Sequence, residues 1–155
     1  CRFQVGSAGV PGLFGRSPEF SSVVEWVLVP ATVTSFLGIG AVTVDGAGHT
    51  FTNNHIGFKS IGTALYATQA DGTTENASAS LRTLSTNMME SLIVVVNGTT
   101  SVDYYTLEES GVLSAATTLT ANLPTAANNV LQWSVSNNSG TNRLVIVVSG
   151  WSYKR

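Results

Sequence analysis

Two histidines and an aspartate form the only cluster of candidate metal ligands in the sequence. Asp45 precedes a Gly-Ala-Gly segment that leads to His49, and His55 follows six residues later. Residues an even number of positions apart point to the same face of a β-strand, so His49 and His55 could share one face. A zinc site needs three or four protein ligands, and no third His, Cys or carboxylate stands at a ligand spacing. We therefore expect no metal and no cofactor.

The side chains that support covalent or acid–base catalysis are scattered along the chain. A Ser, His and Asp triad can be assembled around His49, but the Gly-x-Ser-x-Gly turn that presents a nucleophilic serine is missing. Glu108 and Glu109 are paired carboxylates in a predicted turn, where adjacent residues point apart. A glycosidase needs two carboxyl groups about 5–9 Å apart across a cleft. The sequence therefore predicts no catalytic residue and a protein that is not an enzyme.

Four aromatic residues are the candidates for a binding surface. Tyr104 and Tyr105 are adjacent in a predicted strand, so one of them is expected to face outward. Trp151 and Tyr153 alternate near the end of the chain and form a candidate exposed pair. Exposed aromatic rings stack on sugars or anchor protein interfaces. These residues are the predicted binding site.

The composition limits the classes of partner. Only 10% of the 155 residues are charged, against about 25% in an average soluble domain. The net charge is -2, and the seven basic residues form no run that could follow a phosphate backbone, so we expect no nucleic-acid binding. The apolar runs are far shorter than the roughly 20 residues of a membrane-spanning helix. A surface of hydroxyls and amides is typical of extracellular or virion-surface β proteins and suits a subunit that packs against copies of itself.

Strand-forming residues and turn signals alternate along most of the chain, with Asp-Gly and Asn-Gly pairs at tight turns. This spacing predicts an all-β fold, a jelly-roll β-sandwich or a barrel of about nine or ten strands. Residues 83–90 are the one stretch in which a helical turn is expected. The predicted strands are 23–29, 31–44, 49–58, 63–68, 76–84, 90–96, 102–107, 117–123, 130–135 and 143–148.

Two strands are continuously apolar rather than alternating. They contain Leu-Ile-Val-Val-Val at 92–96 and Leu-Val-Ile-Val-Val at 144–148. Such runs are typical of strands that are covered on both faces. In a two-layer sandwich the second cover has to come from outside the subunit, so these strands predict a subunit interface, most simply around a threefold axis.

The first twenty residues differ from the rest of the chain. Glycine recurs at every third position in Gly6, Gly9, Gly12 and Gly15. This is the spacing that a collagen triple helix requires. The alternative is a flexible Gly/Pro linker or tag. The expected organisation is a collagen-like stub or linker at 1–20 and a jelly-roll head at 21–155.

The layout of a short Gly-X-Y segment before a low-charge β domain resembles the trimeric heads of the tumour necrosis factor-like jelly-roll class. Within that class it looks most like the collagen-tethered heads of bacterial spore surfaces and phage fibres. The residues that carry the resemblance are the four glycines, the strand and turn at 91–98 and the last apolar run. The segment 92–98 with Asp-Tyr-Tyr-Thr at 103–106 is also similar to strand-turn-strand units of phage tail-fibre proteins. The resemblance implies a homotrimer whose exposed tip or flank meets a receptor, often a glycan.

Three functions follow, and the first is the main expectation. It is a non-enzymatic trimeric head of a surface fibre or phage tail fibre that binds a receptor, either a glycan or a protein. The second is a capsid or decoration jelly roll with a purely structural role, and the third is a monomeric carbohydrate-binding module. One departure from the heads is the continuation of the chain after the last apolar run, through 149–155. This basic, aromatic tail is expected to pack on a neighbouring subunit or to insert into a partner.

Overall fold

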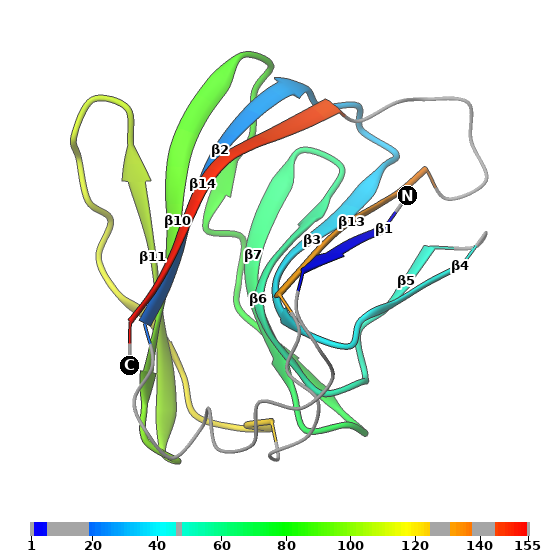
Figure 1. The fold of residues 1–155 in the computed structure, drawn as a ribbon, viewed down its shortest axis with the longest axis vertical. Helices are drawn as coiled ribbons and strands as arrows, with labels where there is room; N and C mark the ends of the chain where they lie inside the picture. The colour runs from blue at the N-terminus through cyan, green and yellow to red at the C-terminus, as the bar shows by residue number, and fades with distance from the viewer. Residues whose placement is uncertain (1, 6–18, 46–47, 125–130, 138–144, 155) are drawn as a thin grey trace.

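The protein is a β-sandwich of two antiparallel sheets, seen in a computed structural model that describes residues 2–5, 19–45, 48–124, 131–137 and 145–154. The described residues form strands and turns and contain no helix, which confirms the predicted all-β class. Figure 1 shows the two sheets face to face, with β10, β2 and β14 in one layer and β7, β6 and β3 in the other. No helix long and apolar enough to cross a membrane occurs in the described ranges.

The larger sheet has seven strands in the order β1-β13-β3-β6-β7-β8, with β9 also paired to β7. Successive side chains of each strand alternate between a face toward the other sheet and a face away from it, here called the outer face. The strands are β1 (Arg2–Val5), β13 (Leu131–Ser136), β3 (Thr34–Gly40), β6 (His55–Ile61), β7 (Ala64–Ala70), β8 (Glu75–Ala77) and β9 (Arg82–Thr83).

The smaller sheet has five strands in the order β12-β11-β10-β2-β14. Its long strands show strict alternation of buried and half-buried residues, because one face packs on the core. Its strands are β12 (Thr117–Leu119), β11 (Ser101–Glu108), β10 (Met88–Asn97), β2 (Glu19–Leu28) and β14 (Val145–Lys154).

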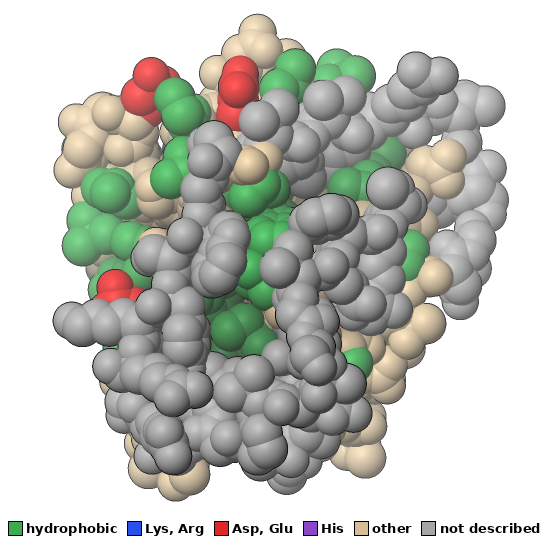
Figure 2. Space-filling model, in the orientation of Figure 1, with side chains coloured by type: hydrophobic (Ala, Val, Ile, Leu, Met, Phe, Trp, Pro, Cys, Tyr) green, Lys and Arg blue, Asp and Glu red, His purple; other side chains and the backbone are tan. Residues whose placement is uncertain are grey.

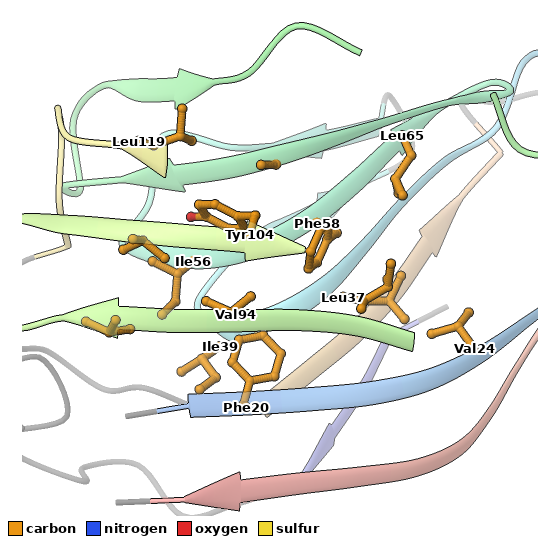
Figure 3. Packing of buried hydrophobic residues seen from close by; sticks show 14 of the residues in the cluster. Phe20, Val24, Leu37, Ile39, Ile56, Phe58, Leu65, Val94, Tyr104 and Leu119 are labelled. Carbon is orange, nitrogen blue, oxygen red and sulfur yellow. The ribbon is translucent and has the colours of Figure 1, made fainter. Parts of the chain in front are cut away.

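Apolar side chains from the inward faces of both sheets form one core (Figure 3). Phe20 and Val94 of the smaller sheet meet Leu37, Ile56 and Phe58 of the larger one. Each fully buried side chain of this size contributes about 1.5–3 kcal/mol to the free energy of unfolding. This core therefore fixes which residues of every strand are left for the outer faces.

A two-stranded hairpin forms a third layer on the outer face of the larger sheet. It consists of β4 (Thr43–Asp45) and β5 (Gly48–Thr50), and Figure 1 shows it on the side of that sheet away from the five-stranded sheet. Gln132 donates a hydrogen bond from Nε2 to the carbonyl of Val42, which is fully buried. The hairpin and the loop that follows it therefore cover part of a sheet face that would otherwise be open to solvent.

The predicted strands are largely confirmed. The predicted strand at 31–44 is divided between β3 and β4, and the one at 76–84 between β8 and β9. Three further differences are found. The helical turn expected at 83–90 is wrong, because the amide of Asn87 donates to the carbonyl of Trp26 and the chain enters β10 at Met88. Residues 49–58 form two strands, β5 and β6, separated by a loop. The tail after 148 is part of β14, which pairs with β2 as far as Lys154 and has an irregular register between Val148 and Gly150.

The beginning of the chain joins the sandwich. β1 pairs with β13, so residues 2–5 extend the larger sheet, and β2 starts at Glu19. The Gly-X-Y residues Gly6, Gly9, Gly12 and Gly15 lie outside the described residues. The collagen-like stalk therefore stays a prediction.

The continuous apolar run in β10 does not lead to complete burial within the subunit. Leu92, Val94 and Val96 are buried in the core, whereas Ile93 and Val95 are half-buried on the other face of the sheet. Figure 2 shows a surface with few charges, on which acidic side chains stand singly and no described Lys, Arg or His side chain appears. The small number of charges on this surface agrees with the low-charge composition.

Candidate functional site

The outer face of the larger sheet carries rows of side chains set by strand register. Phe36, Lys59 and Tyr66 are direct partners on β3, β6 and β7. The next row along the strands, on the same face, contains Gly38 and Gly57, which pair with each other. A Cβ atom on Gly38 would lie 2.8 Å from Cζ of Phe36, so the glycine leaves the space that this ring occupies. The glycine row therefore creates a hollow in which aromatic side chains gather.

A buried ion pair lies in this hollow. Lys59 Nζ is 2.5 Å from Glu75 Oε1, and the side chains of Lys59 and Glu75 are 8% and 24% exposed. Thr68 donates a hydrogen bond to the same carboxylate oxygen at 2.6 Å. Lys59 has N–H groups to spare and the second oxygen of Glu75 has no hydrogen bond to a described residue. The pair is thus held rigidly and keeps hydrogen-bonding capacity for a ligand.

Two partly exposed aromatic rings lie close to the ammonium group of Lys59. Lys59 Nζ lies 4.8 Å from the ring centroid of Phe51 and 5.8 Å from that of Tyr66. Both distances are within the range of cation–π attraction. Phe51 is also stacked on His49, with ring centroids 5.4 Å apart. We call the set of Phe36, His49, Phe51, His55, Lys59, Tyr66, Thr68 and Glu75 the outer-face cluster.

The ring nitrogens of the two histidines make separate hydrogen bonds within the cluster and to its neighbours. His49 bridges Thr34 and Ser134 through its two ring nitrogens, at 2.7 and 2.9 Å. His55 is fully buried, donates from Nδ1 to the carbonyl of Asn53 and contacts Thr68 through Nε2 at 2.9 Å. Among the described residues, no group of three His, Cys, Asp or Glu side chains could hold a metal ion.

Burial is the main cause of the lowered pKa of His55. Loss of solvent lowers its pKa to about 4, and the hydrogen bond to Asn53 and the nearby Glu75 oppose this change only partly. The imidazole is therefore neutral at pH 7. A neutral ring at this position leaves Lys59 as the cationic group of the cluster.

The predicted tyrosines lie on opposite faces of β11, on the smaller sheet. Tyr104 is buried in the core, where its hydroxyl donates to the carbonyl of Thr68 and approaches Gln69 Oε1, both at 3.1 Å. This burial raises the pKa of the Tyr104 hydroxyl well above its usual value. Tyr105 is half-buried on the face away from the core. One tyrosine of the pair thus faces outward, as expected from the alternation.

The other two predicted aromatic residues are in β14. Trp151 pairs with Ser22 and Tyr153 with Phe20 in the register of the sheet. Their side chains lie outside the described part of the structure. A binding role for Trp151 and Tyr153 stays a prediction.

The cluster contains residues that sequence reasoning did not select. Phe51, Lys59, Tyr66 and Glu75 come from a loop and three strands, and their proximity depends on the register of β6, β7 and β8. The available signal was the period of two, which places His55 and Lys59 on one face of a strand. A lysine in the middle of an apolar strand, at position 59, was a second signal.

No protein-family model and no curated protein matches the sequence. Solved structures do match the fold. A protein of unknown function from Shewanella oneidensis MR-1 has a TM-score of 0.70 at 9% identity, covering 90% of this chain and 57% of that one. A legume lectin-like domain from Entamoeba histolytica has a TM-score of 0.58 at 11% identity, covering 98% and 74% of the two chains.

A carbohydrate-active enzyme is also among the similar structures. A xylan β-1,4-xylosidase from Bacillus halodurans C-125 has a TM-score of 0.59 at 14% identity, covering 90% of this chain and 28% of the enzyme. The chain therefore spans little more than half of the Shewanella protein and about a quarter of the xylosidase. These likenesses show a lectin-like β-sandwich fold, in agreement with the predicted jelly-roll sandwich.

Proposed function

We propose that this chain is a non-catalytic carbohydrate-binding module that works on the outside of a cell or virion. The observation that carries the proposal is the pair of partly exposed rings, Phe51 and Tyr66, close to the ammonium group of the Lys59–Glu75 ion pair. Binding sites combine apolar and aromatic walls with a few fixed polar groups. Tyr66 and the exposed part of Phe51 offer apolar surface for the C–H groups of a sugar ring, and Lys59 and Glu75 offer a donor and an acceptor for its hydroxyls.

The arrangement favours binding over hydrolysis. Glu75 is the only carboxylate of the outer-face cluster, and it is neutralised by Lys59. Glycoside hydrolysis needs a second carboxyl group on the other side of the scissile bond. The neutral pair suits an uncharged saccharide, and the lectin-like fold supports the same class of ligand. We expect no cleavage of any glycan that the protein binds.

The expected result of removing either ring is a loss of glycan affinity. Tyr66→Ala and Phe51→Ala should each weaken binding at least tenfold, which is about 1.4 kcal/mol, because a sugar loses one of its two apolar walls. A glycan array on the purified protein would identify a ligand, and calorimetric titration of wild type and variants would measure the change. Product analysis of the same mixtures would test for cleavage.

Tyr105→Ala is the matched control, since it removes a half-buried tyrosine from the smaller sheet. The control should bind like wild type. Equal losses in Tyr105→Ala and Tyr66→Ala, or no binding to any neutral or acidic glycan by the wild-type protein, would contradict the proposal. Release of a shortened saccharide would contradict its non-catalytic part.

A self-assembling head, trimeric in the fibre hypothesis, is a second candidate function. It is favoured by Ile93 and Val95, which are half-buried on the face of the smaller sheet away from the core. Burial of such residues between subunits would stabilise an assembly by about 25 cal/mol per Å² of apolar surface. We expect a stable oligomer at micromolar concentration that Val95→Lys weakens, measured by light scattering with Ser91→Lys as a control on the same strand. A wild-type monomer would contradict this candidate.

A further inference from the structure

A groove lined by hydroxyl groups opens at the edge of the sandwich. It has a volume of about 350 Å³ and lies between the segment that joins β8 to β9 and the segment that joins β11 to β12. Hydroxyl side chains from both segments line it, and the buried Tyr104 also belongs to the lining. These hydroxyl residues are Ser78, Ser80, Thr106, Ser114 and Thr117. None of the lining residues belongs to the outer-face cluster.

The lining carries no ionisable side chain apart from the buried tyrosine. The nearest sequence neighbour with a charge, Arg82, is held by Glu90 and Glu108 at 3.1 and 3.4 Å. An anionic or cationic ligand would lose its water in this groove without gaining a counter-charge, which is unfavourable. The groove therefore suits an uncharged ligand with several hydroxyl groups.

Thr106 is a mostly buried residue that lines the groove. Its side chain is on the inward face of β11, the residue is 6% exposed, and its hydroxyl makes no hydrogen bond to a described residue. The backbone of Thr106 is fully used, because its amide donates to Ser114 Oγ and its carbonyl accepts from the Ser114 amide, both at 2.9 Å. A ligand hydroxyl that bonds to the Thr106 side chain would replace water in the groove, so Thr106 is a candidate hydrogen-bonding group.

Neighbouring hydroxyls extend this polar surface. Ser114 Oγ accepts from the Thr106 amide, so its own proton is available to donate to a ligand. Thr117 has no hydrogen bond from its hydroxyl to a described residue. The methyl groups of Ala79 and Ala115 lie between the hydroxyls in the same lining. Alternating hydroxyl and methyl groups match the alternating O–H and C–H groups of a sugar ring.

We propose that this groove is a second saccharide site that binds one or two neutral pyranose residues, with Thr106, Ser114 and Thr117 as hydrogen-bonding groups. The size agrees, since an apolar cavity of about 150 Å³ holds one benzene ring and the groove is a little more than twice as large. The inference does not rest on the proposed function of the outer-face cluster. It assigns a separate set of residues, although the lining residue Tyr104 contacts the backbone carbonyl of Thr68 in the cluster.

The test is an amide NMR titration of the whole chain with methyl glycosides of glucose, galactose, mannose, xylose and N-acetylglucosamine. At least one glycoside should shift the amides of Thr106 and Ser114, with a dissociation constant on the order of millimolar. Ala115→Phe fills the groove from an exposed position and should weaken this binding at least tenfold. Thr106→Val removes only the hydroxyl and should weaken it about three- to tenfold.

Ala116→Phe is the matched control, because Ala116 is exposed next to Ala115 and does not line the groove. It should bind like wild type, and so should Tyr66→Ala, which separates this site from the outer-face cluster. Absence of shifts with every glycoside would overturn the proposal. So would shifts that Ala115→Phe leaves unchanged, or selective binding of cyclohexanol, which would show an apolar rather than a saccharide site.

Discussion

Acidification from about pH 7 to about pH 4 is expected to remove about 3 kcal/mol of the free energy of unfolding through His55. The pKa of this buried imidazole is about 4 in the folded protein and 6.5 when it is solvated. The unfolded chain therefore binds a proton in this range that the folded protein does not bind. The stabilisation is complete above pH 6.5 and is lost as the pH falls toward 4.

Glu90 changes the free energy of unfolding with pH in the opposite direction. Its contribution has to be separated from that of His55. Burial raises the pKa of Glu90, and the hydrogen bond from Trp26 and the charge of Arg82 lower it only partly. The folded state therefore binds the carboxyl proton more tightly than the unfolded state, and stability rises as the pH falls through the folded pKa. The difference between wild type and His55→Gln at each pH cancels the contribution of Glu90.

Urea unfolding of wild type and His55→Gln between pH 4 and 7 measures this difference. The variant should be less sensitive to acid by about 3 kcal/mol, whatever its stability at pH 7. Parallel curves would show that the pKa of His55 is not lowered in the folded protein. The contacts offer a route to that result, because Thr68 donates its only proton to Glu75 and could accept one from Nε2 of His55.

The strands were predictable because burial in this fold follows a local rule. In β10, Leu92, Val94 and Val96 point to the core and the residues between them do not, as the alternation requires. The sheet order was not predictable, because a strand's pattern does not specify its neighbour. β2, for example, lies between β10 and β14, and both partners are far from it in the sequence.

The outer-face cluster was not predictable for the same reason. Lys59 meets Phe36 and Tyr66 only because β6 pairs with β3 on one side and with β7 on the other, in one particular register. A shift of one residue would send Lys59 to the opposite face. The hollow depends on Gly38 facing Gly57, and neither glycine carries a motif that indicates this role.

The two adjacent tyrosines show what strand alternation can and cannot predict from the sequence. Alternation correctly separated Tyr104 from Tyr105 by face, but it could not say which one faces outward. Tyr104 faces inward because its hydroxyl finds Thr68 and Gln69 in the other sheet, which makes burial of a polar group tolerable. Contacts of this kind lie more than thirty residues away along the chain.

Replacing Arg82 with methionine is expected to destabilise the protein by about 3–5 kcal/mol at neutral pH, because it leaves a buried carboxylate without its cation. Glu90 has a fully buried side chain, and Nη1 of Arg82 lies 3.1 Å from its Oε2. The remaining partner is Trp26, whose Nε1 donates to Oε1 at 2.8 Å. A single neutral donor does not compensate for the loss of solvent around a charged group.

The double variant Arg82→Met with Glu90→Gln tests this explanation by chemical denaturation. It should recover most of the loss, since glutamine is neutral and its carbonyl oxygen still accepts the hydrogen bond from Trp26. Glu108→Gln is the control for the other partner of Arg82, whose side chain is 46% exposed, and should cost less than about 1 kcal/mol. Acid should also reduce the difference between Arg82→Met and wild type, because protonation of Glu90 removes the unpaired charge. A double variant as unstable as Arg82→Met would show that the arginine stabilises the sandwich by packing rather than by charge.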